Sequence, residues 1–169
     1  MASAIIITLT VAALFICSSK EQYLLLTNEL SGQVLFCVTA DQGSEFAVSF
    51  NHSVNKSPVI EYYRIENGLI YLKSLRYYTF GAGMPTELLQ GQTMRHEEDG
   101  AMVIEGFDRP IPHLVYNIGR ISNHTLHWQG REIPLNTLDA PGQPILFSLI
   151  VYPRLWPTLH GYTTRAISP

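Results

Sequence analysis

The chain has 169 residues and a mass of 19.0 kDa, which is enough for one domain with short extensions. Apolar residues make up 46% of it and charged residues only 15%, so the composition favours a packed core and excludes a disordered chain. The net charge of −3 excludes the strongly basic class that binds nucleic-acid backbones. Two cysteines, Cys17 and Cys37, exclude a disulfide scaffold and a four-cysteine zinc site. The six histidines show no metal-site spacing, so we expect no metal and no other cofactor.

The N-terminal segment is apolar and without charge from Ala2 to Cys17. This run is shorter than the roughly 20 residues of a membrane span and closer to the core of a signal peptide. We therefore expect residues 1–20 to be a signal peptide or a signal anchor. The protein would then lie at the cell membrane on its periplasmic or extracellular side, or be secreted if the segment is cleaved. Cys17 suggests a lipoprotein cysteine, but Ile16 stands where such signals need a small residue, so cleavage and lipidation stay open.

The rest of the chain shows short runs of period two between turn signals, which is typical of an all-β protein. The even positions from Phe46 to Val54 are apolar except for His52, and a second run covers residues 59–66. Residues 55–58 between the runs read as a four-residue hairpin loop, and Asn67-Gly68 is a strong signal for a two-residue hairpin turn.

Counting back from these two turns predicts how three strands pair. The first turn places His52 opposite Glu61, and the second places Glu61 opposite Ser74 and Arg76 opposite Val59. On this register, His52, Glu61, Ser74 and Arg76 share one corner of an otherwise apolar face. We therefore predict a polar corner at the loop end of these strands.

Later segments continue the β pattern. The turn Asp99-Gly100 should join residues 94–98 with 101–105, and Gln129-Gly130 should join 125–128 with 131–135. Residues 144–152 read as a late strand, and residues 153–169 as an irregular tail. The predicted fold is a single all-β domain over residues 21–152, an antiparallel sandwich or partly open barrel built of hairpins.

The polar corner has two interpretations. One is an ion-pair network that fixes the strand register, because a buried carboxylate, imidazole and guanidinium must satisfy one another. The other is a binding corner in which Arg76 and His52 face an anionic group and Glu61 holds them in place. A serine triad is disfavoured because Glu61, rather than His52, would lie in the middle, and because Ser53 points to the opposite face from His52.

A glycine-rich loop follows the third of these strands at Phe80 to Pro85. Its Gly81, Ala82 and Gly83 suit either a plain tight turn or an anion-binding nest of backbone amides. The loop lacks the Gly-Lys-Ser/Thr ending of a phosphate-binding P-loop. The candidate binding residues are therefore His52, Ser53, Glu61, Ser74, Arg76, Gly81, Ala82, Gly83 and Pro85, with no catalytic or metal-binding residue among them.

Three stretches, residues 50–65, 75–87 and 104–126, carry a resemblance to a known family. The ordered pattern His-Ser-Val, Pro-Val-x-Glu and Gly-Ala-Gly-x-Pro falls here on residues 52–54, 58–61 and 81–85. In this pattern the chain resembles the bacterial family called domain of unknown function eighteen-fifty, over residues 33–135. Met84 departs from the leucine common at its position, and the residues from Asn136 onward are not covered.

The resemblance implies a small exported protein of the kind encoded beside TAXI-type TRAP transporters, which pair an extracytoplasmic solute-binding protein with a membrane permease. We therefore expect a non-enzymatic, membrane-tethered accessory or adaptor of such an uptake system. Its partner would be the permease or the solute-binding protein. Two alternatives stay open: a stand-alone binder of a small anionic ligand, and an extracytoplasmic hydrolase.

Overall fold

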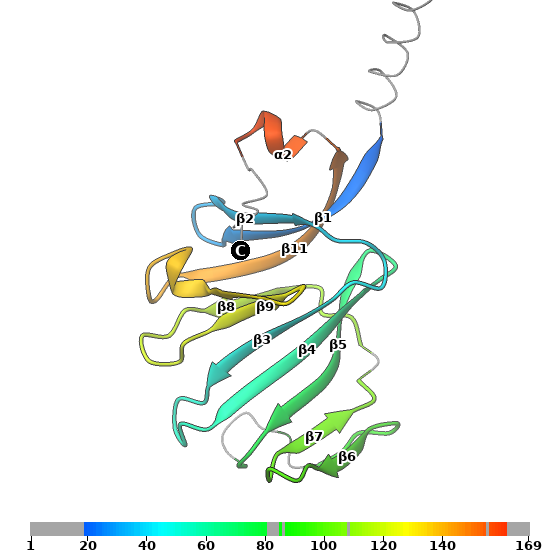
Figure 1. Cartoon of the computed structure of the whole chain (residues 1–169), viewed down its shortest axis with the longest axis vertical. Coiled ribbons are helices and arrows are strands. Elements are labelled where there is room, and N and C mark those ends of the chain that lie inside the picture. The colour runs from blue at the N-terminus through cyan, green and yellow to red at the C-terminus, as the bar shows by residue number, and fades with distance from the viewer. Residues whose placement is uncertain (1–18, 81–84, 86, 108, 155, 162–169) are drawn as a thin grey trace, which may run out of the picture.

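The computed structural model describes residues 19–80, 85, 87–107, 109–154 and 156–161. Over these residues the chain forms the strands β1 to β11, one 3-10 turn and the short helix α2. The strands make two antiparallel sheets that face each other (Figure 1). The prediction of an all-β sandwich is thus confirmed.

The small sheet joins the two ends of the domain. Its strand order is β2-β1-β11-β8, with β1 at Lys20–Asn28, β2 at Val34–Thr39, β8 at Leu114–Asn117 and β11 at Pro144–Pro153. Strand β1 pairs with β11 over its full length, from Lys20 opposite Pro153 to Asn28 opposite Ile145. Residues 144–152 therefore form the predicted late strand, whose apolar side chains alternate toward the core.

The large sheet carries the central hairpins. Its order is β10-β9-β3-β4-β5-β7-β6. The strands are β3 Glu45–Asn51, β4 Pro58–Glu66, β5 Leu69–Tyr77, β6 Thr93–His96, β7 Met102–Glu105, β9 Thr125–Trp128 and β10 Arg131–Pro134. The large sheet extends well beyond the small sheet at the bottom of Figure 1.

Two of the predicted hairpin turns form as expected. Asn67 and Gly68 have φ values of 50° and 73°, and Gln129 and Gly130 have values of 47° and 77°. Positive φ at both central residues is the type I′ geometry whose twist matches the flanking strands. The strands beside these turns pair directly across two residues, as predicted. The Asp99-Gly100 hairpin also forms, but its loop is one residue longer, because the Glu97 amide donates to the Ala101 carbonyl.

The predicted register of the β3–β4 hairpin is wrong by four residues. Asn51 pairs with Pro58, so the loop spans residues 52–57 and Glu61 lies opposite Val48 rather than His52. The His52 side chain closes this longer loop, since its Nδ1 accepts a hydrogen bond from the Val54 amide at 3.2 Å. Because the shift is an even number, each side chain keeps its predicted face.

The predicted register of β4 and β5 holds only as far as Tyr63, which lies opposite Leu72. The next pair is Tyr62 with Ser74, so Lys73 is an extra residue and forms a β-bulge. Beyond the bulge, each side chain of β5 points to the face opposite to the predicted one, so Ser74 and Arg76 lie on the outer face of the sheet. The prediction that they share a face with Glu61 is therefore wrong, because a count of alternating residues cannot register an extra one.

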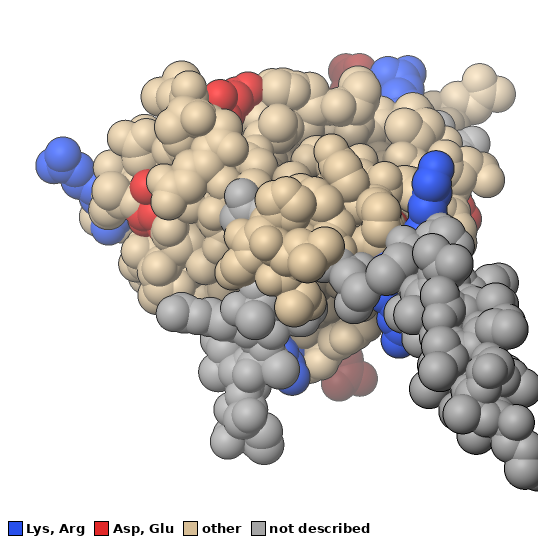
Figure 2. Space-filling model, turned by 90° about the horizontal axis from the view of Figure 1, so that it is seen from above, with Lys and Arg blue, Asp and Glu red and all other residues tan. Residues whose placement is uncertain are grey.

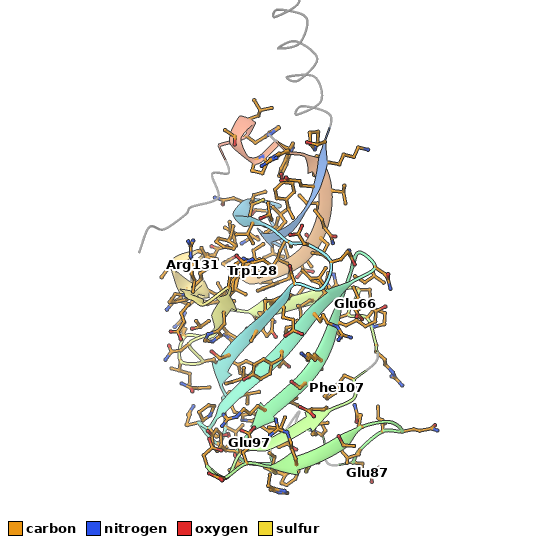
Figure 3. The ribbon with its side chains drawn as sticks, turned by 45° about the vertical axis from the view of Figure 1, so that its right-hand side comes forward. Glu66, Glu87, Glu97, Phe107, Trp128 and Arg131 are labelled. Atoms are coloured by element: carbon orange, nitrogen blue, oxygen red, sulfur yellow. The ribbon has the colours of Figure 1, made fainter. Side chains whose placement is uncertain are left out.

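The bulge also turns apolar residues of β5 inward. The main core between the sheets contains Leu24, Leu26, Phe46, Val48, Tyr63, Ile65, Tyr116, Leu126, Trp128, Ile145 and Phe147. A second cluster, made of Val59, Leu75, Tyr77, Met102 and Ile104, lies on the end of the large sheet beyond the small one, and Phe107 packs against it. In Figure 3, Trp128 lies near the small sheet and Phe107 lies lower.

The two ends of the chain differ from the β pattern. The helix α2 spans Trp156–Leu159, a single turn inside the tail that was expected to be irregular. Proline at the first turn of a helix is well tolerated because its missing amide would have no partner there.

The predicted signal segment and Cys17 lie outside the described residues. Within the described residues, no helix has the length and apolar character needed to cross a membrane.

Gly106, at the end of β7, offers a test of this packing. It has a φ of +85°, and a Cβ there would come within 2.2 Å of the Gly91 carbonyl oxygen. We expect Gly106→Ala to lower the free energy of unfolding by about 2 to 4 kcal/mol, from backbone strain plus the clash. Urea denaturation measures this change.

Gly142→Ala is the matched control for Gly106→Ala. Gly142 also has a positive φ, but a Cβ there meets nothing within 4 Å, so only the strain is added. Equal losses of stability in the two variants would contradict the close approach of Gly91 to β7.

Candidate functional site

A carboxyl group and two phenols meet between the two sheets. Glu61 on β4 accepts hydrogen bonds through Oε2 from the Tyr63 hydroxyl, at 3.0 Å, and from the Tyr116 hydroxyl on β8. The two phenol oxygens are themselves 2.6 Å apart. The group therefore ties the large sheet to the small one, and we call it the Glu61 cluster.

Burial shifts the pKa values of the groups in the Glu61 cluster. It raises the pKa of Tyr63 and of Tyr116 far above their ordinary value, so both phenols keep their protons. Burial also raises the pKa of Glu61 above 4.5, against the opposing effect of the hydrogen bonds from Tyr116 and Tyr63. The cost of burying the charge is the larger of these two effects on the pKa of Glu61.

Aromatic rings lie on one side of the Glu61 cluster, toward the β3–β4 loop. The His124 ring lies 5.1 Å from the Phe50 ring and 5.6 Å from the Tyr116 ring, measured between centroids. Burial lowers the pKa of His124, so its imidazole is neutral at pH 7. The sequence contained no signal that linked His124 or Tyr116 to Glu61, because they come from distant segments.

Three loops meet at the same end of the large sheet. The β3–β4 loop, residues 52–57, contacts the segment after β5 through the hydroxyls of Ser57 and Thr79, which are 2.9 Å apart. The β8–β9 loop, residues 118–124, joins them through the Asn51 amide, which donates to the Ser122 carbonyl at 2.7 Å. We call the surface formed by these loops, including residues 78–80, the hairpin-end surface.

Exposed apolar side chains mark the hairpin-end surface, with one on each loop. Val54 is 72% exposed, Ile121 is 61% exposed and Phe80 is 54% exposed. Sequence reasoning missed Ile121 and gave no role to Val54 or Phe80. The available signal was the presence of a large apolar residue inside a turn, where polar residues are usual.

The two predicted binding residues of the β3–β4 loop, His52 and Ser53, lie beside this surface but differ in solvent exposure. His52 is 6% exposed and supports the loop from within, whereas Ser53 is exposed. The structure therefore places His52 on the same side of the sheet as Glu61 but in the loop beyond the strand. Their predicted side-by-side pairing is wrong, because the pair Phe50–Val59 lies between them.

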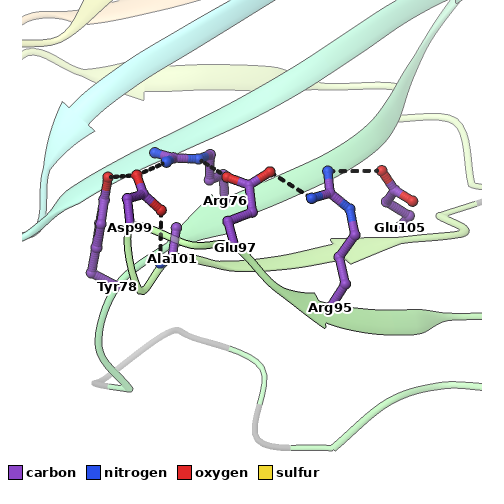
Figure 4. A network of polar contacts seen from close by, with 7 residues as sticks. All are labelled: Arg76, Tyr78, Arg95, Glu97, Asp99, Ala101 and Glu105. Atoms are coloured by element: carbon purple, nitrogen blue, oxygen red, sulfur yellow. Dashed lines mark hydrogen bonds and ion pairs between the residues drawn. The ribbon is translucent and has the colours of Figure 1, made fainter.

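Arg76 belongs to a separate polar network on the outer face (Figure 4), and Ser74 lines the depression beside it. The Arg76 guanidinium donates to Glu97 at 2.8 Å and also to Asp99, and its contact with Glu97 lowers the pKa of that carboxyl. Arg95 bonds the other oxygen of Glu97 at 2.5 Å. These residues line a shallow depression of about 390 Å³ in which Lys73 also pairs with a carboxylate, that of Glu45. Arg76, which was expected to face an anion, is thus already paired with carboxylates.

Of the glycine-rich loop, the structure describes Phe80 and Pro85. The predicted residues Gly81, Ala82 and Gly83 lie outside the described residues. Pro85 is half-buried, and its carbonyl accepts a hydrogen bond from the Tyr77 hydroxyl at 3.4 Å. This contact brings the segment against the second apolar cluster.

A serine, a histidine and a carboxylate come together in an unexpected place, on the outer face of the large sheet. Ser49 Oγ lies 2.7 Å from His127 Nε2, and His127 Nδ1 lies 3.7 Å from Glu132 Oε1. The histidine is in the middle, which is the order of a serine triad. The Ser49 backbone, however, lies inside the sheet between β4 and β9, so its own amide cannot form an open oxyanion hole.

The described part of the chain holds no group of three or more His, Cys, Asp or Glu side chains arranged to bind a metal ion.

The fold and this surface define a β-sandwich domain that presents apolar loops at one end. The chain belongs to the family described as a domain of unknown function (DUF1850), whose match covers residues 46–135. That range contains the Glu61 cluster and all three loops of the hairpin-end surface. No curated protein matches the chain, and no solved structure does.

The Glu61 cluster predicts a specific pH dependence. The folded-state pKa of Glu61 lies above its unfolded value, so the stability that its protonation contributes is fully present below pH 4.5 and is lost as the pH rises through the folded pKa. Glu61→Gln removes this titration. We expect the free energy of unfolding of the wild type, relative to that of Glu61→Gln, to fall with rising pH by at most about 1.4 kcal/mol per unit.

Urea denaturation across this pH range measures the difference, with Glu87→Gln as the control, because Glu87 is exposed. A pH-independent difference between wild type and Glu61→Gln would show that Glu61 does not bind a proton in the folded state.

Proposed function

We propose that the protein is an extracytoplasmic, membrane-tethered accessory protein of a TAXI/TRAP-type solute-uptake system and that it is not an enzyme. It docks its partner through the hairpin-end surface. The apolar run at residues 2–17 supports export or tethering. The family match spans every loop of the hairpin-end surface, so this surface belongs to the family's own domain.

The observation that carries the proposal is the exposure of Val54, Ile121 and Phe80 on three loops at one end of the large sheet. An exposed group of large apolar side chains on a soluble domain usually marks a contact with another macromolecule. Loops on a rigid sheet are also where binding residues are most often found. The partner is the permease or the solute-binding protein of the system.

Charge substitutions on the hairpin-end surface test this proposal. Val54→Asp combined with Ile121→Asp places two carboxylates in a contact that is apolar in the wild type. We expect copurification of the tagged protein with the permease or the solute-binding protein to fall at least about tenfold, and solute uptake to fall with it. Quantitative pull-down from the native membrane measures the loss.

Leu30→Asp is the matched control, because Leu30 is 77% exposed but lies in the β1–β2 turn of the small sheet. It should copurify like the wild type. Equal retention of partner by all three proteins would refute docking through the hairpin-end surface.

A hydrolase is the second candidate, and the contact of Ser49 with His127 and Glu132 favours it. A serine activated in this way reacts with fluorophosphonates. The hydrolase candidate predicts labelling at Ser49 that is lost in His127→Ala and kept in Ser53→Ala. Mass spectrometry of the labelled peptide decides between the two functions, since an accessory protein without catalysis gives no labelling at Ser49.

A further inference from the structure

The end of the sandwich where the apolar segment joins the domain has an exposed face of its own. Strand β1 begins at Lys20, three residues after the uncharged run ends at Cys17. Lys20 pairs with Pro153 at the end of β11, and the Arg154 amide donates to the Ser19 carbonyl at 2.9 Å. The chain therefore emerges from the apolar segment directly beside the end of β11 and α2.

Aromatic and aliphatic side chains cover this end. Tyr152 is 40% exposed and Leu159 is 76% exposed. The Tyr152 and Trp156 rings stack with their centroids 4.4 Å apart and their planes 18° apart, and His160 continues the stack at 5.0 Å from Trp156. A stacked tyrosine and tryptophan with one edge toward water are the side chains found where a protein meets the headgroup level of a bilayer.

The charges around this face suit the same environment. Arg154 lies between Tyr152 and Trp156 in the chain, and the carboxylate of Glu21, which is opposite Tyr152 in the sheet, lies 3.3 Å from Arg154. Figure 2 looks down on this end of the molecule: the charged side chains lie around the rim, and the centre of the view carries none. Long basic side chains at a rim can reach lipid phosphates while their methylene groups cover apolar surface.

We propose that Tyr152, Arg154, Trp156 and Leu159 form a membrane-proximal face that rests on the interface of the lipid bilayer. The proposal rests on the membrane tether of the proposed function, because the apolar segment ends at this face and brings it to the bilayer. The contact fixes the orientation of the domain, which a single flexible tether would leave free.

The two tryptophans of the chain allow a direct test. Trp156 lies on the membrane-proximal face, whereas Trp128 is 3% exposed in the core. The full-length protein is reconstituted into phosphatidylcholine and phosphatidylglycerol vesicles with and without brominated acyl chains, which quench tryptophan only on contact. We expect brominated lipid to remove roughly half of the wild-type emission, because one of two tryptophans lies at the interface. The Trp156→Phe variant, which reports Trp128 alone, should keep its emission.

A second variant separates the face from the tether. Tyr152→Ser combined with Leu159→Ser should reduce the quenching of Trp156 while the protein still floats with the vesicles, and Leu30→Ser should change neither.

Flotation with unquenched Trp156 in the wild type overturns the membrane-proximal face and leaves the tether intact. Absence of flotation overturns the tether and the face together. Protection of Trp156 from both brominated lipid and aqueous acrylamide would mean that protein, such as a second copy of the chain, covers the face, and this too would overturn the proposal.

Discussion

The architecture of the large sheet depends on one extra residue in β5. Lys73 has no partner in the register between β4 and β5. From that point on, each side chain of β5 points to the opposite side of the sheet from the one that strict alternation would give it. Leu75 and Tyr77 thereby face the interior and build the second apolar cluster with Val59. The Arg76 side chain therefore lies on the outer face, where it pairs with the carboxylates of Glu97 and Asp99. Without the bulge, a guanidinium would lie in the apolar interior, and burying it there would be costly.

The Glu61 cluster shows how a sandwich can keep a carboxyl group inside. Tyr63 and Tyr116 satisfy Glu61 from both sheets, and the rise in the pKa of Glu61 reflects the cost of burying its charge. This arrangement differs from the ion-pair network that one interpretation of the sequence expected. Phenols replace the cations, and the cluster fixes the two sheets against each other by hydrogen bonds rather than by opposite charges.

The two proposed contact surfaces lie at different ends of one rigid body. Figure 1 places the start of β1 and α2 at the top and the β3–β4 loop at the bottom. A domain that rested on the bilayer through Tyr152 and Trp156 would hold Val54, Ile121 and Phe80 away from it. In the two proposals taken together, the sheets between these surfaces act as a spacer, which favours a partner that stands away from the bilayer.

The sequence by itself determined the all-β class, the two-residue turns at Asn67-Gly68 and Gln129-Gly130, and the late strand at residues 144–152. These features depend on local chemistry: alternation within a strand and the left-handed conformation that glycine tolerates. Only the tertiary structure decided that Glu61 meets Tyr116, that Ser49 meets His127 and that β1 pairs with β11, because each contact joins segments far apart in the chain. The prediction of a polar corner was wrong because a loop closed by His52 and a bulge at Lys73 each changed the strand register. The energies of this loop and this bulge depend on which side chains the rest of the fold buries.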